Sequence, residues 1–535
     1  MELLEGNNPL STTEHEQNQQ QQQHQHGNNF YNMMLEEFNF EPALRQTRQF
    51  QETRGLKNKQ QLENYNKQVL LPPSSLASSL ELLSNYRSRF KSLMGKNISN
   101  NETCVHPHKL STEEIMRVAG ARYVQNSSPS HCHDNFCIPT HPYGFGLGVL
   151  SEEENRDIEL VQFLLAAAEI VGCQQFERAS ILLLHCQWNT SSGGSPVQRV
   201  IFHFAQALRE RINSEMGGKG RMILNGPQKN KEWEMIQELV LDTCIAVKCH
   251  QKIPFNQVMQ FAGVQAIVEH VASKTKVHLI DLDIGFGVLA TALMQALAER
   301  HERPVELLKI TAIGLIGKNN LQETGKRLVS FAESLKLPFS YKTVCVTDIM
   351  ELKEEQFKID DDEAVAIHAP YILRTMVSNS DYLETLMRVI RKIKPCIMIV
   401  LEMEANHNTP SFVNRFIEAL FFFSAYFDCI GSCLEQDYQC RTRIEAILSE
   451  GIRNIVAMED RERTVRNVKI DVWRRFFARY RMVETGFSES SVYQANLVAK
   501  NFACGNFCTL DKNGKCLIVG WKGTPIHSIS AWKFL

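Results

Sequence analysis

The segment Asp281-Leu-Asp-Ile-Gly-Phe-Gly287 has the residue types of a ligand-binding turn. Its two glycines, two residues apart, allow a tight turn after an apolar stretch, as in folds that bind nucleotides or S-adenosylmethionine. Methyltransferases have D-x-G-x-G-x-G here, whereas this chain has Asp283 where the first glycine is expected. A carboxylate at that position would face the carboxylate end of the ligand or crowd its approach. We therefore predict a retained scaffold without a ligand, and S-adenosylmethionine binding is the alternative.

Two further segments resemble parts of a methyltransferase site. An acidic residue after the second strand would hold the ribose of the cofactor, but Ala312-Ile-Gly-Leu-Ile-Gly317 has no acid at that place. His368-Ala-Pro-Tyr371 is similar to the Asp/Asn-Pro-Pro-Tyr motif, in which a side-chain oxygen accepts a hydrogen bond from a target amino group. A neutral His368 accepts through only one ring nitrogen, and the first proline is absent. We interpret this segment as a structural turn.

Two groups of residues have the ligand types of a metal site. Glu402-Met-Glu-Ala-Asn-His-Asn408 gathers two carboxylates and an imidazole, which would suit zinc or manganese, but no second His or Cys lies nearby at ligand spacing. The other group matches no zinc pattern and comprises Cys104, His106, His131, Cys132, His133, Cys137 and His141. We interpret them as a polar turn and an ordinary loop. The sequence also has no G-x-S-x-G motif and no P-loop, so we predict no catalytic, cofactor-binding or metal-binding residues.

The elements that position these turns alternate between strand and helix. Val277 to Leu282 has the apolar density of a central parallel strand, and Gly287 to Ala298 has leucines at a helical spacing of four. Further strand candidates are Leu308–Ile313, Tyr341–Val346, Ala364–His368 and Cys396–Leu401, with helical patterns at Leu321–Lys336 and Asp381–Ile393. This alternation predicts an α/β fold with a Rossmann-like or methyltransferase-like, mostly parallel sheet and helices on both faces. Asn513-Gly514 between two apolar segments predicts a closing antiparallel hairpin.

A helical block precedes the predicted sheet. From Ile158 to Ile212 apolar residues recur at helical spacing, and in the last helix Val197, Ile201, Phe204, Leu208 and Ile212 step by four, three, four and four. Such a stripe is expected either in an intramolecular cap on the core or in a dimerisation surface. Upstream, Ser111-Thr-Glu-Glu114 is a capping box that predicts the start of a short helix.

Composition excludes several classes of protein. The 535 residues have a formal net charge of -2, so electrostatics alone would give little non-specific affinity for nucleic acid. The chain has no continuous run of about 18 apolar residues and no secretory signal pattern, and its 15 cysteines are scattered through apolar segments. These features predict a soluble intracellular protein, in the nucleus or the cytosol, with free thiols. The predicted regions are a disordered, Gln/Asn-rich stretch over 1–104, a short helix and linker over 105–150, and a folded domain over 151–535.

Two local patterns leave alternatives open. Phe30–Phe40 mixes acidic and aromatic residues, so it is either a local hydrophobic cluster or a short activation or docking segment that folds on a partner. Two sets of basic residues are interleaved with apolar ones, which favours solvated helix faces over a nucleic-acid patch. These sets are Arg388, Arg391, Lys392 and Lys394, and Arg474, Arg475, Arg479 and Arg481.

Taken together, the segments resemble the plant GRAS family of transcriptional regulators over about residues 155–535. The ordered motifs are the first leucine-rich region (155–215), the VHIID region (235–301), the second leucine-rich region (316–348), the PFYRE region (358–456) and the SAW region (459–535). The motif residues, taken as structural or partner-binding, are Val277, His278, Leu279, Ile280, Asp281, Glu402, Glu404, Asn406, His407, Arg453, Glu459, Trp473, Trp521, Ser530, Ala531 and Trp532.

The chain also departs from the family pattern. The family usually has Asn-Gln-Gly and then Gln-Trp after the VHIID motif, whereas this chain has Gly285-Phe-Gly287 and no tryptophan there. The leucine-rich regions look most like those of the DELLA group, but residues 1–150 contain no DELLA or VHYNP segment, so binding of the gibberellin receptor is not implied.

The resemblance implies a nuclear regulator that binds transcription factors or other GRAS proteins as a homo- or heterodimer, and a distribution shared with the cytoplasm is the alternative. It implies no cofactor, no membrane association and only indirect contact with DNA, with direct DNA binding and methyl transfer as alternatives. From the residues we expect Asp281, Glu402, Asn406 and Trp532 to hold loops at the sheet edge. We expect exposed apolar residues of Ile158–Ile212 to anchor a partner helix.

Overall fold

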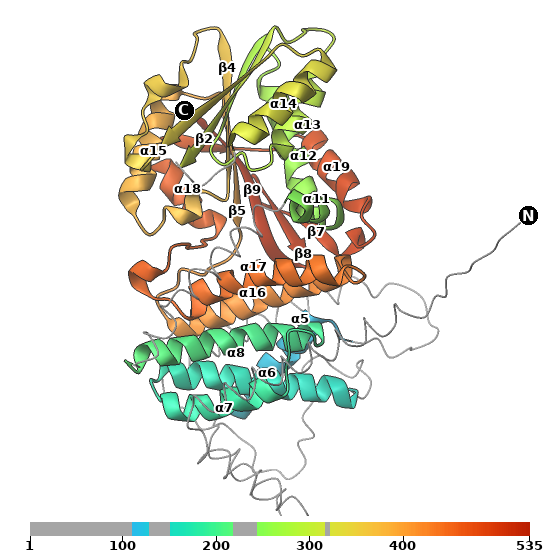
Figure 1. Ribbon diagram of the computed structural model, residues 1–535, viewed down its shortest axis with the longest axis vertical. Helices are drawn as coiled ribbons and strands as arrows, with labels where there is room; N and C mark the ends of the chain where they lie inside the picture. The colour runs from blue at the N-terminus through green and yellow to red at the C-terminus, as the bar shows by residue number, and fades with distance from the viewer. Residues whose placement is uncertain (1–109, 128–149, 218–242, 316–320) are drawn as a thin grey trace, which may run out of the picture. The chain divides into compact units, whose positions relative to one another are not determined.

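A mixed β-sheet forms the centre of the computed structural model, which describes residues 110–127, 150–217, 243–315 and 321–535 (Figure 1). The strand order is β3-β2-β1-β4-β5-β9-β8-β7, and β6 pairs with β9. The strands are β1 (Lys276–Asp281), β2 (Leu307–Leu315), β3 (Phe339–Val346), β4 (Glu363–Pro370), β5 (Ile397–Met403), β6 (Met482–Thr485), β7 (Cys508–Asn513), β8 (Cys516–Trp521) and β9 (Thr524–Phe534).

The first five strands are parallel and have the 3-2-1-4-5 order of doubly wound folds. Successive strands are added on one side of β1 as far as β3, and then on its other side from β4 onward. At this boundary, Asp281 of β1 lies opposite His368 of β4. In such folds this reversal point, at the carboxyl ends of the strands, is where ligands bind. The predicted Rossmann-like sheet is confirmed, and so is its antiparallel end, in which Gly514 turns the β7–β8 hairpin with a φ of 61°.

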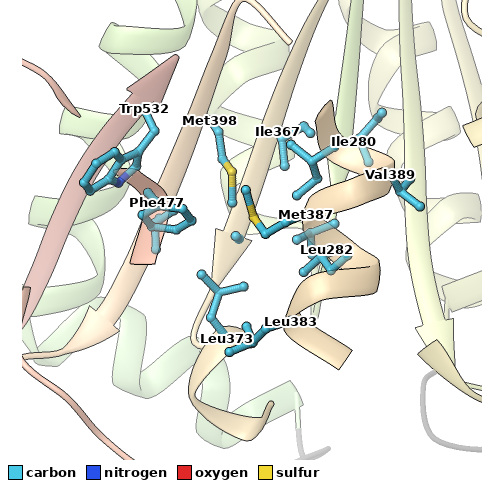
Figure 2. Packing of buried hydrophobic residues seen from close by; sticks show 14 of the residues in the cluster. Ile280, Leu282, Ile367, Leu373, Leu383, Met387, Val389, Met398, Phe477 and Trp532 are labelled. Atoms are coloured by element: carbon cyan, nitrogen blue, oxygen red, sulfur yellow. The ribbon is translucent and has the colours of Figure 1, made fainter. Parts of the chain in front are cut away.

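Helices cover both faces of this sheet (Figure 1). On one face lie α12, α13, α14 and α19, and on the other lie α15 and α18. Figure 2 shows part of the core on the second face, where Met387 from α15, Phe477 from α18 and Trp532 from β9 pack over the strands. The helices that cover the sheet are α12 (Pro254–His270), α13 (Val288–Ala298), α14 (Leu321–Leu335), α15 (Ser380–Ile393), α18 (Ile470–Ala478) and α19 (Glu489–Lys500). A further helix, α11 (Thr243–Lys252), contacts α12.

A second layer consists of helices alone. Its members are α5 (Thr112–Ser127), α6 (Glu152–Gly172), α7 (Phe176–Trp188), α8 (Pro196–Glu215), α16 (Phe412–Cys433) and α17 (Tyr438–Val456). The predicted stripe on α8 faces inward, where Phe204 meets Phe416 and Phe423 of α16 with ring centroids 5.3 Å and 6.2 Å apart. For α8, the intramolecular-cap alternative is therefore correct. The predicted α-helical cap thus includes two helices that follow β5 in the chain, α16 and α17.

Two features of the helical layer differ from what composition suggested. The helix α5 packs against α6 and α16, so the packed part already includes described residues before Ser151, from Leu110 to Ser127. In the described part of the chain, α16 is long and apolar enough to cross a membrane by length and composition. However, 78% of its apolar window is buried inside the fold, so contacts within the protein account for its composition.

Other predictions concern residues that the structure does not describe. The disordered stretch 1–104 and the His131–His141 group lie outside the described residues, as does most of the linker before Leu150. The same is true of 316–320, directly after β2. Two strands, β6 and β9, were not predicted as strands. The longer of them, β9, is almost wholly buried and pairs with β5, β6 and β8.

Candidate functional site

The carboxyl edge of the sheet holds Asp281, which ends β1, against His368 of β4. Asp281 is 1% exposed, and both of its carboxylate oxygens accept hydrogen bonds. The His368 Nδ1 donates to Oδ2 over 2.9 Å, and the Asp283 backbone N–H donates to Oδ1 over 3.1 Å. Groups of the same chain therefore occupy the carboxylate, which joins β1 to β4 and to the glycine turn.

The glycine turn itself is formed as predicted. Gly285 and Gly287 have φ values of 49° and 74°, which glycine adopts without strain. A Cβ on Gly287 would lie 3.1 Å from Thr324 of α14, so the turn is also tightly packed against that helix. Asp283 keeps an exposed side chain, yet its dense surroundings, followed by the charge of Asp281, raise the pKa of Asp283 to about 6. The turn thus presents a carboxyl group where a methyltransferase presents a glycine.

His278, in the middle of β1, takes part in a buried polar cluster across three strands. Its side chain is fully buried, and its two ring nitrogens lie 3.1 Å from Glu363 Oε2 on β4 and 2.8 Å from Thr311 Oγ1 on β2. Burial, reinforced by the positive charge of Lys309, lowers the pKa of His278 to about 3. A neutral imidazole between two partners joins strands and is not open to a ligand. Val277, Leu279 and Ile280, the other apolar residues of the motif, are buried in the core.

A second polar group lies where β4 and β5 end and the antiparallel β9 begins. Glu402 of β5 is 2% exposed and accepts a hydrogen bond from the Arg374 backbone N–H over 3.2 Å. Burial, only partly offset by the charge of Arg374, raises the pKa of Glu402 to about 7. Tyr371, which has a φ of 54°, places its hydroxyl 3.2 Å from Nδ1 of His527. The His-Ala-Pro-Tyr segment was predicted as a structural turn, but its first three residues end β4 and only Tyr371 lies in the bend that follows.

The Glu402–Asn408 turn continues this hydrogen-bonded network. Glu404 accepts from the Ile470 N–H over 3.0 Å, and His407 Nδ1 lies 3.0 Å from the Asn467 amide nitrogen. Asn467 in turn accepts from the Arg374 guanidinium over 3.4 Å. Burial lowers the pKa of His407 to about 3, and Asn406 is half-buried with its carbonyl accepting from Thr409. The turn binds other parts of its own chain.

Ion pairs tie the helical layer to the segment after α17. Glu459 pairs with Arg211 of α8 over 2.6 Å and also with Arg415 of α16. Arg453 of α17 makes a bidentate pair with Glu210 of α8, with both contacts at 2.7 Å. These contacts hold α8 against α16 and α17, so Arg453 and Glu459 have a structural role as ion-pair partners between the helices.

A family model identifies this arrangement. The model described as "GRAS domain family" matches residues 160–533. The chain belongs to the GRAS family. GRAS family protein RAD1 of Medicago truncatula is 31% identical over 70% of this chain and 72% of its own length. DELLA protein GAI1 of Vitis vinifera is 28% identical over 72% of this chain and 63% of its own length, so the chain spans less than two thirds of that relative.

A solved structure supports the fold of this GRAS protein. SCL7 of Oryza sativa matches with a TM-score of 0.61 and 24% identity over 70% of this chain and 99% of that chain. Members of the family are regulators and not enzymes, so the chain is a plant GRAS regulatory protein.

Three tryptophans in the carboxyl-terminal third of this GRAS protein are structural anchors. Trp521 is fully buried, and its indole N–H donates to Asp428 of α16 over 2.7 Å, which joins β8 to the helical layer. Trp532 donates to the Ser530 hydroxyl over 2.8 Å and packs on Phe477 with centroids 4.5 Å apart. Trp473 of α18 stacks on Phe477 with ring centroids 6.0 Å apart, and Ala531 is buried in β9.

One cleft of about 400 Å³ lies beside the Glu402–Asn408 turn. Its walls come from α16, the start of α18, the β7–β8 turn, β8 and the β8–β9 turn, and no residue of the glycine turn contributes. Among the described residues, no group of three or more His, Cys, Asp or Glu side chains is arranged to hold a metal ion.

The outer face of α7 exposes large apolar side chains, whereas the sheet edge buries polar ones. Ile181 and Trp188 are 58% and 57% exposed, and Leu184 and His185 lie between them at helical spacing. Figure 1 shows α7 on the side of the helical layer away from the sheet. The first leucine-rich region is therefore divided, with α8 facing the core and α7 offering apolar side chains to solvent.

Three residues at the sheet edge were missed by sequence reasoning: Arg374, Asn467 and His527. They bring together β4, the segment before α18 and β9, which lie far apart in the chain. No local pattern marks them, because an isolated Arg, Asn or His has no periodicity. Covariation between pairs of positions in an alignment of relatives would have been needed to find them.

Proposed function

We propose that this GRAS protein is a nuclear transcriptional regulator that acts by binding transcription factors and other GRAS proteins, including second copies of itself. The observation that carries the proposal is the exposed apolar stripe on α7, centred on Ile181 and Trp188. Ile181, Leu184 and Trp188 lie at positions i, i+3 and i+7, and apolar side chains at this spacing are anchors of helix-to-helix recognition. They belong to the leucine-rich region through which the family resemblance implies partner binding.

The alternatives receive less support from the sheet edge and from the charge. A methyltransferase would need Asp281 and the glycine turn free for its cofactor, whereas both oxygens of Asp281 bond to the chain itself. A direct DNA-binding factor would be favoured by a strong positive charge, whereas the net charge is -2. Regulation through protein partners requires neither feature.

The test is a tethered reporter in plant nuclei, with the full chain fused to a heterologous DNA-binding domain. We expect reporter output to change, and to change less when residues 1–104 are removed, since that stretch has the composition of an effector arm. Unfused protein carrying a fluorescent tag should accumulate in nuclei.

Two controls separate the candidate functions. Isothermal titration with S-adenosylmethionine should show no binding, and tight binding would support the enzyme alternative. Salt-sensitive, sequence-selective binding of purified protein to DNA would support direct DNA recognition. A silent reporter together with exclusion from the nucleus would overturn the proposal.

A further inference from the structure

Four cysteines gather where α16 meets the segment between α19 and β7. Cys429 and Cys433 lie one turn apart at the end of α16, Cys504 precedes the short helix η6 (Gly505–Phe507), and Cys508 begins β7. The Sγ atoms of Cys433 and Cys504 are 2.6 Å apart, while those of Cys429 and Cys433 are 3.9 Å apart. The first separation is shorter than the contact distance of two unbonded sulfur atoms and approaches the length of about 2.05 Å of a disulfide.

We propose that Cys433 and Cys504 form an oxidative modification site, at which a peroxide converts the two thiols into a reversible disulfide within the chain. The site is independent of the proposed partner surface on α7, since neither cysteine belongs to that helix. Among the described residues no metal-binding group is formed, so sulfur–sulfur chemistry suits this cluster better than metal binding.

The backbones on both sides of the pair are held in place. Cys433 is the last residue of α16, which the Leu434 N–H closes by bonding to Ile430 over 2.9 Å. On the other side, a Cβ on Gly505 would lie 1.9 Å from the Ala499 carbonyl oxygen, so this glycine lets the chain pack directly against the end of α19. The Lys522 N–H also donates to Phe507 over 2.7 Å. Because neither backbone has to move far, the two sulfur atoms are preorganised to react.

The reaction balances with hydrogen peroxide as the oxidant. Cys433 is half-buried and Cys504 is 8% exposed, so Cys433 meets the peroxide first. The thiol first releases its proton, and the thiolate attacks one peroxide oxygen. The O–O bond breaks, and a sulfenic acid and a hydroxide form; the hydroxide takes up the released proton and leaves as water. The Cys504 sulfur then attacks the sulfenic sulfur, the S–O bond breaks, and a second water carries away the Cys504 proton. The peroxide is reduced and two thiols become one disulfide.

The neighbourhood sets the pace of this reaction. Hydrogen bonding with Cys429, together with burial, raises the pKa of Cys433, and hydrogen bonding with Cys433 raises that of Cys504. The reactive species is the thiolate, so only a small fraction of Cys433 is ready to react at neutral pH. The site therefore responds to sustained and not to brief exposure to peroxide.

The bond would join parts of the fold that are far apart in sequence. Cys433 and Cys504 are 71 positions apart, and the loop between them contains α17, α18, β6 and α19. Closing a loop of this size restricts the unfolded chain far more than the folded one, in which the sulfurs are already adjacent. The disulfide form should therefore unfold at a higher temperature than the dithiol form.

The experiment uses the reduced full-length chain, exposed to hydrogen peroxide, alkylated and digested for mass spectrometry. We expect a Cys433–Cys504 linked peptide that disappears after dithiothreitol, and a melting temperature several degrees above that of the reduced chain. Cys433→Ser should abolish both results. Cys345→Ser, which removes an exposed cysteine on β3, and Cys429→Ser should retain both.

The outcomes decide the proposal as follows. Recovery of Cys433 as an alkylated thiol or a sulfinic acid, without the linked peptide, would overturn it. The same conclusion would hold if the linked peptide joined Cys433 to Cys429, or if the rise in melting temperature persisted in Cys433→Ser. The melting curve of each reduced variant is recorded first, and Cys504→Ser replaces Cys433→Ser if the latter does not fold.

Discussion

The carboxyl edge of the sheet and the outer face of α7 use their side chains in opposite ways. At the sheet edge, Asp281, Glu402 and His407 are at most 2% exposed and bond to other parts of the same chain. On α7, Ile181 and Trp188 are more than half exposed and meet solvent. Where doubly wound folds bind ligands, these three side chains are thus closed to a ligand, although Asp283 beside them is exposed. The outer face of α7, which a helix bundle normally leaves polar, exposes Ile181 and Trp188 beside the polar His185.

This difference shows how one fold can keep its architecture and change its task. The sheet, the glycine turn and the strand reversal remain, but the groups that would meet a cofactor now hold loops together. Under the proposed function, binding depends instead on the helical layer that packs against the sheet. Function therefore has to be argued from the two surfaces and not from the fold alone.

The largest effect is expected from a pair of tryptophan substitutions, one in each region. Trp521→Ala removes a fully buried ring and its bond to Asp428, so it should lower the free energy of unfolding by about 3–5 kcal/mol. Trp188→Ala removes a ring that is 57% exposed and should change the stability by no more than about 0.5 kcal/mol. Urea unfolding of both variants is the measurement. Equal losses would show that α7 is part of the core and would remove the contrast between the regions.

A second effect concerns the closed edge and its dependence on pH. Glu402 has a usual pKa of 4.5, and burial raises its pKa to about 7 in the folded chain. Between these values the unfolded chain releases the proton while the folded chain keeps it, so the contribution of Glu402 to stability falls as pH rises from 4.5 to 7. Over that window, the wild type should lose about 3 kcal/mol relative to Glu402→Gln.

The measurement is the difference in unfolding free energy between wild type and Glu402→Gln at several pH values. The buried His407 and His527, whose folded pKa values are lowered to about 3, destabilise the protein as the pH falls below 6.5. They do so in both proteins, so their effect cancels in the difference. A difference that stays constant from pH 4.5 to 7 would mean that Glu402 is ionised when buried.

A third and smaller effect is expected at the VHIID motif. Asp281→Asn keeps one acceptor oxygen but places an N–H₂ group against either His368 or the Asp283 N–H, so the free energy of unfolding should fall by about 1–3 kcal/mol. Thermal melting of the purified variant measures this. An unchanged melting temperature with abolished reporter activity would show that Asp281 acts directly in function and not through folding.

The sequence predicted the parts of this fold that have a local period. An apolar run identified Val277 to Leu282, the Asn513-Gly514 pair identified the hairpin turn, and helical periodicity identified the α8 stripe. The β9 strand was missed because it is buried on both faces and includes His527, Ser528 and Ser530, which interrupt an apolar run. A serine or histidine satisfied by distant partners cannot be distinguished from an exposed one in a single sequence.

The candidate site was predicted less completely than the fold. The altered glycine turn and the Glu402–Asn408 run were visible because their residue types are unusual after a strand. Their partners Arg374 and Asn467 were not, since tertiary contacts alone bring them to the edge. Similarly, periodicity identified apolar faces on the helices but did not say which face a second helix would cover.

The smallest effect on stability is expected on α7, where the effect on function should be large. Ile181→Asp places a charge in the exposed stripe, so the free energy of unfolding should change by no more than about 0.5 kcal/mol. If α7 anchors a partner helix, the same charge would be desolvated on binding and should reduce association at least tenfold. The control is Val329→Asp, which places the same charge at a 40% exposed position on α14.

Sedimentation of the purified full chain, alone and mixed with a second GRAS protein, would measure association, and the tethered reporter would measure output. A loss of both with Ile181→Asp, and of neither with Val329→Asp, would sharpen the contrast between a closed sheet edge and an open helical face. Equal behaviour of the two variants would break it, because exposed apolar area would then carry no information about where partners bind. Partner binding would have to be sought elsewhere, and the cleft beside the Glu402–Asn408 turn, where Glu404, Glu418 and Lys469 meet, would be the next surface to mutate.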